Sequence, residues 1–370
     1  MIKIRTLFFV PFLASLLACA GSAPQPINGY VGTFTREGGV GIHSLRFDPA
    51  TGTISDVKLE VPGLRDPSFI CLSPDKTVLY AFNNVTADSA EVIAYRVDAE
   101  TRALTGFSKV KTPTKTFCYI STFDNGKYLG VASYNEGTSY SFPLAADGSI
   151  VDTPSVVQHY GSSVHPRQVT PHAHLILQEP QTGNVYIPDL GLDKIIIYSL
   201  TAGRLDSIGF AQTAIGAGPR HIAFHDGGKY MAALNEINNT VTLYTRDAQG
   251  LFTVAGQTVT TIPGDYQGQT TAADIHFSKD GKALYASNRG HDSVAIYAFD
   301  PETGRLEPKG WILEEIVYPR NFAVDPTGRY LLIANQQGKS IVVYRIGDDP
   351  TQLTYTGHRA EITEPVCIVF

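Results

Sequence analysis

Short stretches in which apolar and polar residues alternate follow one another from residue 28 to the end of the chain. One pair lies within residues 218–236, on either side of the segment Asp226-Gly-Gly-Lys229. A period of two residues predicts a β-strand, and Gly and Asp accept the backbone conformations of tight turns, so this segment is predicted to form an antiparallel hairpin. The hairpin would bring four polar residues together at one end: Arg220, His221, Asn235 and Glu236.

The same pattern returns about every 46 to 55 residues, which is typical of four-stranded propeller blades. First strands are predicted at 67–72, 117–122, 172–177, 220–224, 273–277, 320–324 and 366–370. Second strands are predicted at 30–34, 78–83, 128–133, 185–190, 230–236, 283–289 and 330–336. Third strands, each followed by a loop and a short fourth strand, are predicted at 41–47, 92–97, 139–144, 195–200, 241–246, 294–299 and 341–346.

This repeat predicts an all-β, seven-bladed β-propeller with four antiparallel strands in each blade. The pattern begins near residue 28 with a second strand and ends at residue 370 with a first strand. We therefore expect the C-terminal strand to pair with the N-terminal blade, because this closes the ring and removes an open sheet edge. Residues 28–370 are predicted to form one propeller domain.

The composition is that of a globular, turn-rich β protein, since 43% of the 370 residues are hydrophobic, 17% are charged, and there are 34 Gly and 22 Pro. The formal net charge is -6 without any basic run, so nucleic acid is not expected as a partner. Beyond Cys19, the cysteines Cys71, Cys118 and Cys367 are an odd number in apolar strand patterns, which predicts buried thiols and no disulfide framework. We expect a monomer without a cofactor.

The first 18 residues have the pattern of a signal peptide. Two basic residues precede an apolar run over residues 7–18, which is too short to span a bilayer but fits the hydrophobic region of a secretory signal. Leu16-Leu-Ala-Cys19 resembles a bacterial lipobox, in which Cys19 would be lipidated, and cleavage after Ala20 is the alternative. Residues 19–27 would form a tether. We expect an exported protein, either periplasmic or a membrane-anchored lipoprotein, with secretion or an uncleaved anchor as alternatives.

In a propeller, the starts of the first strands and the ends of the second strands share one mouth of the central channel, where we expect a small ligand to bind. Candidate residues at this mouth are His172, His174, Asp189, Arg220, His221, Asn235, Glu236, Asn288, Arg289, Arg320 and Gln336. Several arginines would repel one another without an anion, which favours a carboxylate or phosphate ligand. His172 and His174 share one face of a strand, but no further ligand has clear spacing, so no metal site is expected. Alternatively, Arg220 and Glu236 only tie two strands together, and His221 is a hydrogen-bonded wall residue.

Seven segments carry a resemblance to a known family: Tyr30-Val-Gly-Thr-Phe-Thr35, Pro171-His-Ala-His174, Tyr186-Ile-Pro-Asp-Leu-Gly191, Gly216-Ala-Gly-Pro-Arg-His221, Leu234-Asn-Glu236, Tyr285-Ala-Ser-Asn-Arg-Gly-His-Asp-Ser293 and Ala334-Asn-Gln336. On these segments the chain resembles the seven-bladed lactonase family, which includes bacterial 6-phosphogluconolactonases of the propeller type and fungal carboxymuconate lactonising enzymes. The resemblance covers nearly everything after residue 28 and implies catalytic roles for His172, Arg220, Glu236 and Arg289. Two positions depart from the family's pattern, because Asp274 stands where a glutamate is expected and Asn321 where a histidine is common.

The resemblance implies a hydrolase that opens a sugar or related anionic lactone. Arginines would hold the anionic group and polarise the ester carbonyl, Glu236 or His172 would activate water, and the other polar side chains at the mouth would bind substrate. Export favours an unphosphorylated lactone, because 6-phosphogluconate belongs to the cytoplasm. Two alternatives remain: a carboxymuconate-type cyclase, in which Glu236 delivers a proton to carbon, and a non-enzymatic propeller that binds a partner or a carbohydrate.

Overall fold

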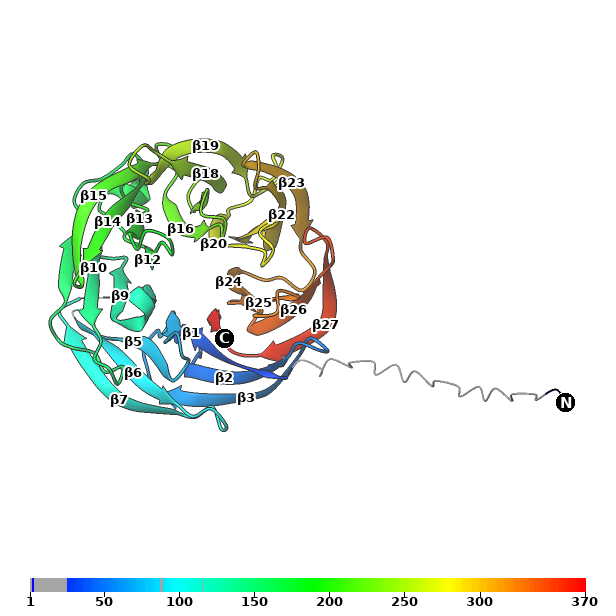
Figure 1. Ribbon diagram of the computed structural model, residues 1–370, viewed down its shortest axis with the longest axis horizontal. Coiled ribbons are helices and arrows are strands. Elements are labelled where there is room, and N and C mark those ends of the chain that lie inside the picture. Colours follow the sequence, from blue (N-terminus) through cyan, green and yellow to red (C-terminus); the bar gives the residue numbers. More distant parts are fainter. Residues whose placement is uncertain (1, 3–24, 87–88, 115) are drawn as a thin grey trace.

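The structure is a computed structural model that describes residue 2 and residues 25–86, 89–114 and 116–370. Seven four-stranded sheets surround a central axis, and Figure 1 looks onto the ring that they form. The predicted all-β, seven-bladed propeller is confirmed. The predicted signal peptide, except for residue 2, and the lipobox cysteine fall outside the described residues.

Each blade contains four antiparallel strands, ordered from the axis outward. Blade 1 contains β28 (Pro365–Val369), β1 (Ile27–Thr33), β2 (Gly41–Asp48) and β3 (Thr53–Pro62). Blade 2 contains β4 (Ile70–Leu72), β5 (Val78–Thr86), β6 (Ser89–Val97) and β7 (Leu104–Thr112). Blade 3 contains β8 (Tyr119–Phe123), β9 (Tyr128–Ser133), β10 (Thr138–Pro143) and β11 (Ser155–Gln158), with a 3-10 turn, η1 (Asp124–Gly126).

Blade 4 contains β12 (Leu177–Gln178), β13 (Val185–Asp189), β14 (Lys194–Thr201) and β15 (Arg204–Gln212), preceded by the 3-10 turn η2 (Pro166–Gln168). Blade 5 contains β16 (Pro219–Phe224), β17 (Met231–Asn235), β18 (Thr240–Arg246) and β19 (Phe252–Thr260). Blade 6 contains β20 (Thr271–Phe277), β21 (Ala283–Arg289), β22 (Ser293–Asp300) and β23 (Arg305–Ile312). Blade 7 contains β24 (Pro319–Val324), β25 (Tyr330–Asn335), β26 (Ser340–Ile346) and β27 (Leu353–Glu361).

The first and last strands of the chain lie side by side in one sheet. β28 pairs antiparallel with β1 and places Ile368 opposite Val31. An apolar cluster that includes Val31, Ile368 and Leu332 packs blade 1 against blade 7. Because burying one such aliphatic side chain contributes about 1.5–3 kcal/mol, the ring closes through packing as well as through backbone hydrogen bonds. The predicted pairing of the two ends is confirmed.

The innermost strand of blade 4 is much shorter than predicted. Only β12 pairs continuously, and the residues before it form an isolated bridge between Ala173 and Asp189. The carbonyl of Pro188 accepts a hydrogen bond from the N–H of His174 at 3.0 Å, but proline has no N–H to return. The ladder therefore stops, and the predicted strand over 172–177 was wrong for most of its length. β4 and β8 also begin later than the predicted strands at 67–72 and 117–122.

The three described cysteines are free thiols, as the sequence predicts. Cys367 is buried in β28, and burial raises the pKa of Cys118 to about 12. These thiols therefore stay protonated and pack as small apolar groups. Within the part of the chain that the structure describes, no helix has the length and apolar character needed to cross a membrane.

Candidate active site

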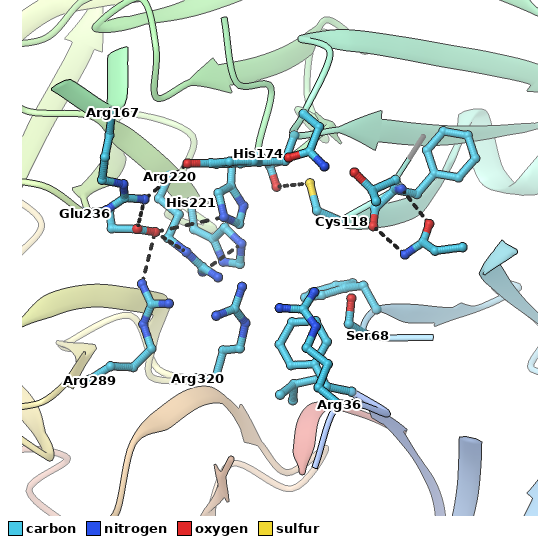
Figure 2. A pocket seen from close by; sticks show the side chains of 18 residues that line it. Arg36, Ser68, Cys118, Arg167, His174, Arg220, His221, Glu236, Arg289 and Arg320 are labelled. Atoms are coloured by element: carbon cyan, nitrogen blue, oxygen red, sulfur yellow. Dashed lines mark hydrogen bonds and ion pairs between the residues drawn. The ribbon is translucent and has the colours of Figure 1, made fainter. Parts of the chain in front are cut away.

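A cavity of about 320 Å³ lies where the inner strands of the seven blades converge (Figure 2). Each blade, or the loop leading into it, contributes to the wall, so the cavity lies on the axis of the ring. Its lining residues are Phe34, Arg36, Ser68, Phe69, Asn84, Thr116, Phe117, Cys118, Tyr134, Asn135, Arg167, His174, Arg220, His221, Glu236, Arg289, Arg320 and Val366.

Two arginines reach this cavity from equivalent irregularities in the strand pairing. In blade 5 the register between β16 and β17 shifts at Arg220, and in blade 7 the register between β24 and β25 shifts at Arg320. Each arginine follows a proline, Pro219 or Pro319. A β-bulge re-aims a side chain relative to the sheet. The repeated Pro-Arg dipeptide therefore places a guanidinium group at the same point of two blades.

Glu236 follows β17 directly and is almost completely buried, with 3% of its surface exposed. Its Oε2 atom lies 2.9 Å from Arg220 Nε and 3.0 Å from Arg289 Nη2, and its Oε1 atom accepts a hydrogen bond from Arg167 Nη2. Figure 2 shows these three side chains converging on the carboxylate. His174 lies farther away, with Nε2 4.0 Å from Glu236 Oε2.

The arginines determine the charge of Glu236. Burial on its own would raise the pKa of this carboxyl group, but the positive charges of Arg289 and Arg220, with a smaller contribution from Arg167, outweigh burial and hold the pKa well below its usual range. Glu236 is therefore ionised near neutral pH.

Positive charge exceeds negative charge in this cavity. Glu236 is the only carboxylate among the described residues that line it, whereas five arginines line it. Arg36 has its own counter-ion outside the cavity wall, because its Nε lies 2.9 Å from Asp66 Oδ2. The remaining four arginines face one carboxylate, which leaves a surplus of three positive charges.

Of the four arginines that face Glu236, Arg320 is the one that forms no ion pair with it. Within the described residues its guanidinium has no hydrogen-bond or ion-pair partner, and it lies over the ring of Phe34 at 4.8 Å from the centroid. Burial and the charges of Arg289 and Arg220 lower the pKa of Arg320 well below its usual range. Figure 2 shows this group directed into the space beside Arg220 and Arg289. A cation held in this way is ready to bind an anion.

Two neutral imidazoles complete the polar wall. Burial, followed by the positive charge of Arg220, lowers the pKa of His174 well below its usual range. Burial and the charge of Arg220 lower the pKa of His221 to about 4. The two rings contact each other edge to face, with centroids 5.4 Å apart. Both side chains are therefore uncharged near neutral pH, and each can accept a hydrogen bond on one nitrogen.

The structure brings six of the predicted site residues into the cavity wall: His174, Arg220, His221, Glu236, Arg289 and Arg320. His172 is not one of them. Its ring stacks on Tyr134 at a centroid distance of 4.3 Å, and its Nδ1 atom lies 2.8 Å from the Tyr134 carbonyl oxygen. Tyr134 of the neighbouring blade holds the ring, so His174 lines the axial cavity and His172 does not; the catalytic role of His172 stays a prediction.

Four other predicted residues lie outside the cavity wall, and the side chains of three of them make hydrogen bonds there. Asp189 accepts hydrogen bonds from the backbone N–H groups of His172 and Gly191 and lies 2.6 Å from His159 Nδ1. Asn235 donates to two threonine hydroxyls of β18, and Asn288 donates to the Thr261 carbonyl. Gln336 is partly exposed at the start of a loop. These four side chains do not line the axial cavity, because strand ends that share a mouth do not all point their side chains into it. Their roles in substrate binding stay predictions.

Arg167 is a cavity residue that the sequence pattern did not predict. This residue lies in η2, in the loop between blades 3 and 4, and therefore outside the repeat that directed attention to strand ends. Its loop is held by Gln168, whose buried amide donates to the Leu190 carbonyl and to Asp193 Oδ1. The one available signal was the Pro166-Arg-Gln168 segment, because proline at the first position favours a helical turn.

A metal centre finds no support in the described residues, where no group of three or more His, Cys, Asp or Glu side chains is arranged to hold an ion. The cavity instead offers guanidinium groups, one carboxylate and two neutral imidazoles. These groups can bind an anion, stabilise a developing oxyanion and accept a proton from water.

The fold and this cavity define a class: a seven-bladed propeller with a polar, cationic pocket on its axis. The sequence model described as "Lactonase, 7-bladed beta-propeller" matches residues 28–370, so the chain belongs to this lactonase family.

Individual relatives agree with this assignment. The chain is 32% identical over 343 residues to a protein of Bacillus subtilis named 6-phosphogluconolactonase, covering 92% of this chain and 97% of that protein. Among solved structures it is similar to PpgL, described as a periplasmic gluconolactonase of Pseudomonas aeruginosa, with a TM-score of 0.88, 32% identity and coverage of 94% and 99%. A Lactobacillus plantarum protein gives a TM-score of 0.87 at 28% identity, with coverage of 93% and 99%.

Proposed function

We propose that this protein is a lactonase that hydrolyses a sugar lactone carrying an anionic group, and that the reaction takes place in the axial cavity. The observation that carries the proposal is the surplus of three positive charges there, in a protein whose net charge is negative. A buried cationic pocket of this kind is stabilised by an anionic ligand. The names of the Bacillus and Pseudomonas relatives support lactone chemistry.

The proposed reaction uses a water molecule held between Glu236 Oε2 and His174 Nε2, which are 4.0 Å apart. The water oxygen attacks the lactone carbonyl carbon while its proton passes to Glu236. Arg220 and Arg289 stabilise the oxyanion that develops on the carbonyl oxygen. The bond from the carbonyl carbon to the ring oxygen then breaks, and the ring oxygen takes the proton from Glu236. The product is an open-chain hydroxy acid, and Arg320 binds the anionic group remote from the ester.

The substrate itself would make Glu236 a better base. In the free protein the arginines hold the pKa of Glu236 well below its usual range, which makes its carboxylate a weak base. An anionic substrate bound to the same arginines adds negative charge close to Glu236 and offsets part of their effect. The pKa of Glu236 therefore rises on binding, toward the range in which a carboxylate accepts a proton from water.

This coupling predicts different pH profiles for the two kinetic constants. The value of kcat/KM reports the free enzyme and is expected to stay flat down to about pH 5. The value of kcat reports the substrate complex, and we expect its acidic limb to lie about one pH unit or more above that of kcat/KM. The measurement is a pair of pH profiles with a carboxylated lactone, corrected for spontaneous hydrolysis. Acidic limbs at the same pH for both constants would show that substrate does not tune Glu236.

The proposed function is tested with a panel of lactones that differ in charge: neutral, carboxylated and phosphorylated. We expect kcat/KM for the better anionic lactone to exceed that of its neutral counterpart by about tenfold or more, as one charge-assisted contact contributes roughly 1.5–3 kcal/mol. Equal values for all three would remove the anion from the proposal. No hydrolysis of any lactone, together with muconate cyclisation, would favour the cyclase.

The non-enzymatic alternative makes a different structural demand. A mouth plugged by side chains, or Glu236 buried against Arg220 with no cavity beside them, would favour it. Glu236 is buried against Arg220, but about 320 Å³ of cavity adjoins the pair. We therefore keep the enzyme as the proposal, and carbohydrate binding without turnover is the outcome that would replace it.

We also propose that the protein is exported, with residues 1–18 as a signal peptide and Cys19 as a lipid anchor. The apolar run and the lipobox-like Leu16-Leu-Ala-Cys19 support this proposal. The description of PpgL as periplasmic is consistent with it. Cell fractionation with Cys19→Ala is the test, because loss of lipidation should release the protein from the membrane fraction.

A further inference from the structure

A chain of titratable side chains leads from the catalytic cavity into the wall behind it. His221 lines this cavity and also a second cavity of about 400 Å³, whose wall includes Phe69, Asp274 and His276. Asp274 is 3% exposed and belongs to β20, next to the strand that carries His221. The proposed reaction uses neither Asp274 nor the contact that His221 makes with it.

Three contacts join these residues in order. Asp274 Oδ2 lies 3.0 Å from His276 Nε2, and Asp274 Oδ1 lies 2.7 Å from His221 Nδ1. On the other side of the imidazole ring, His221 Nε2 lies 3.0 Å from Arg220 Nη1. The order is therefore His276, Asp274, His221, Arg220, and it ends at the ion pair between Arg220 and Glu236.

The hydrogen-bond capacities of these groups fix the position of one proton. A guanidinium N–H only donates, so His221 Nε2 must accept from Arg220. An ionised carboxylate only accepts, so His221 Nδ1 must carry the proton and donate to Asp274. A neutral imidazole has one nitrogen of each kind, which matches this arrangement. Arg220 Nη1 also donates to the Ala273 carbonyl, so its guanidinium is oriented by two acceptors in addition to Glu236.

The surroundings of Asp274 keep its carboxylate ionised. Its carboxylate accepts from Asn321 Nδ2 at 2.6 Å and from the Ile275 N–H at 3.0 Å, besides the two histidines. Burial would raise its pKa, but the charge of His276 and the hydrogen bonds from both imidazoles outweigh burial and hold the pKa well below its usual range. Asn321 Oδ1 in turn accepts from the N–H of Ile368 in β28, which ties the ring-closing strand to this cluster. The two positions that depart from the family pattern, Asp274 and Asn321, therefore contact each other.

We propose that Asp274 is a positioning residue for lactone hydrolysis: it holds His221 as the Nδ1–H tautomer, so that Nε2 accepts from Arg220 and fixes the guanidinium that faces the substrate. This series of side chains is not a proton relay, because Arg220 occupies His221 Nε2, the nitrogen that would have to receive a proton from the cavity. This inference deepens the proposed function, but the position of the proton and the binding of an anion can be measured without any turnover.

The first test is ¹⁵N NMR of protein labelled in its histidine side chains, with His221 assigned by comparison with His221→Gln. In the wild type, we expect His221 to show a protonated Nδ1 and an unprotonated Nε2 near neutral pH. Asp274→Asn should abolish this single tautomer, because the Asn amide can donate as well as accept. A wild-type His221 with its proton on Nε2 would overturn the inference.

The second test is the affinity for inorganic phosphate, measured by calorimetry on the wild type and on Asp274→Asn. Loss of a negative charge at residue 274 would by itself tighten phosphate binding, whereas loss of Arg220 positioning would weaken it. We expect Asp274→Asn to bind phosphate about tenfold more weakly, the lower end of the loss seen when an outer partner of a metal ligand is removed. Equal or tighter binding would overturn the inference. His276→Gln is the matched control and should stay within about twofold, because it leaves Asp274 ionised.

A matched pair at residue 221 covers the case in which Asp274→Asn does not fold. The amide of His221→Gln reaches the Nε2 position and can still accept from Arg220, whereas the amide of His221→Asn reaches only the Nδ1 position and contacts Asp274. We therefore expect the Gln variant to bind phosphate within about threefold of wild type and the Asn variant to lose about tenfold. Equal losses would show that the contact with Arg220 is unimportant. If the wild type hydrolyses no lactone, the proposed function fails, while these measurements still decide the role of Asp274.

Discussion

Replacement of Glu236 by Gln is expected to lower kcat for the best lactone by about 100- to 10,000-fold, because it removes the group that takes the proton from water. It is also expected to lower the free energy of unfolding by about 3–5 kcal/mol, because the buried guanidinium groups of Arg220 and Arg289 lose their counter-charge. Initial rates on the lactone panel and denaturant unfolding measure the two effects.

An added anion distinguishes the loss of the Glu236 counter-charge from a non-specific loss of stability in this variant. Inorganic phosphate should raise the Tm of Glu236→Gln more than that of the wild type, since phosphate compensates the arginines in place of the carboxylate. Glu361→Gln is the matched control, because the Glu361 side chain is 71% exposed and should change stability by no more than about 0.5 kcal/mol. Full activity in Glu236→Gln would remove Glu236 from the mechanism, and unchanged stability would refute the charge argument.

Replacement of Arg320 by Met is expected to weaken the binding of an anionic substrate while it increases the stability of the free protein. The KM for an anionic lactone is expected to rise by about 10- to 100-fold, while that for a neutral lactone changes by less than about threefold, because only the anion loses a charge-assisted contact. Stability of the free protein is expected to increase by about 1 kcal/mol, because a guanidinium without a counter-ion leaves the neighbourhood of Arg289 and Arg220.

Two controls accompany the Arg320 variant. Arg320→Lys keeps the charge and should restore part of the affinity but not the planar, two-pronged contact of a guanidinium. Arg345→Met removes an exposed arginine in β26 and should leave both KM values unchanged. Equal increases in KM for neutral and anionic lactones would mean that Arg320 shapes the cavity and does not bind the anion.

The hairpin over residues 218–236 shows what sequence reasoning could reach. β17 lies within its predicted strand, β16 begins one residue before the predicted start at Arg220, and Arg220, His221 and Glu236 line the cavity. Strand alternation and turn residues are local properties, so they can be read along the chain. The bulge that turns Arg220 toward the axis also has a local signature, in the Pro-Arg dipeptide that recurs at Arg320.

His172 and Arg167 show where such reasoning stopped. Equal spacing put His172 and His174 on one face of a strand, but the ladder ends at Pro188 and the His172 ring stacks on Tyr134 of the preceding blade. Arg167 comes from a loop outside the repeat and still reaches Glu236. Both outcomes depend on contacts between blades, which a periodic pattern does not contain.

By itself, the sequence determined the ring: seven repeats of four strands, and two incomplete ends that together make one blade. This was readable because each blade repeats the same local alternation and because an unpaired sheet edge is costly. Only the tertiary structure decided which charges meet. Arg167, Arg220 and Arg289 come from different parts of the ring to share one carboxylate, and Arg320 is left for an anion. Those distances depend on how the blades pack around the axis, because charged groups separated by tens of residues interact only through the positions that packing gives them.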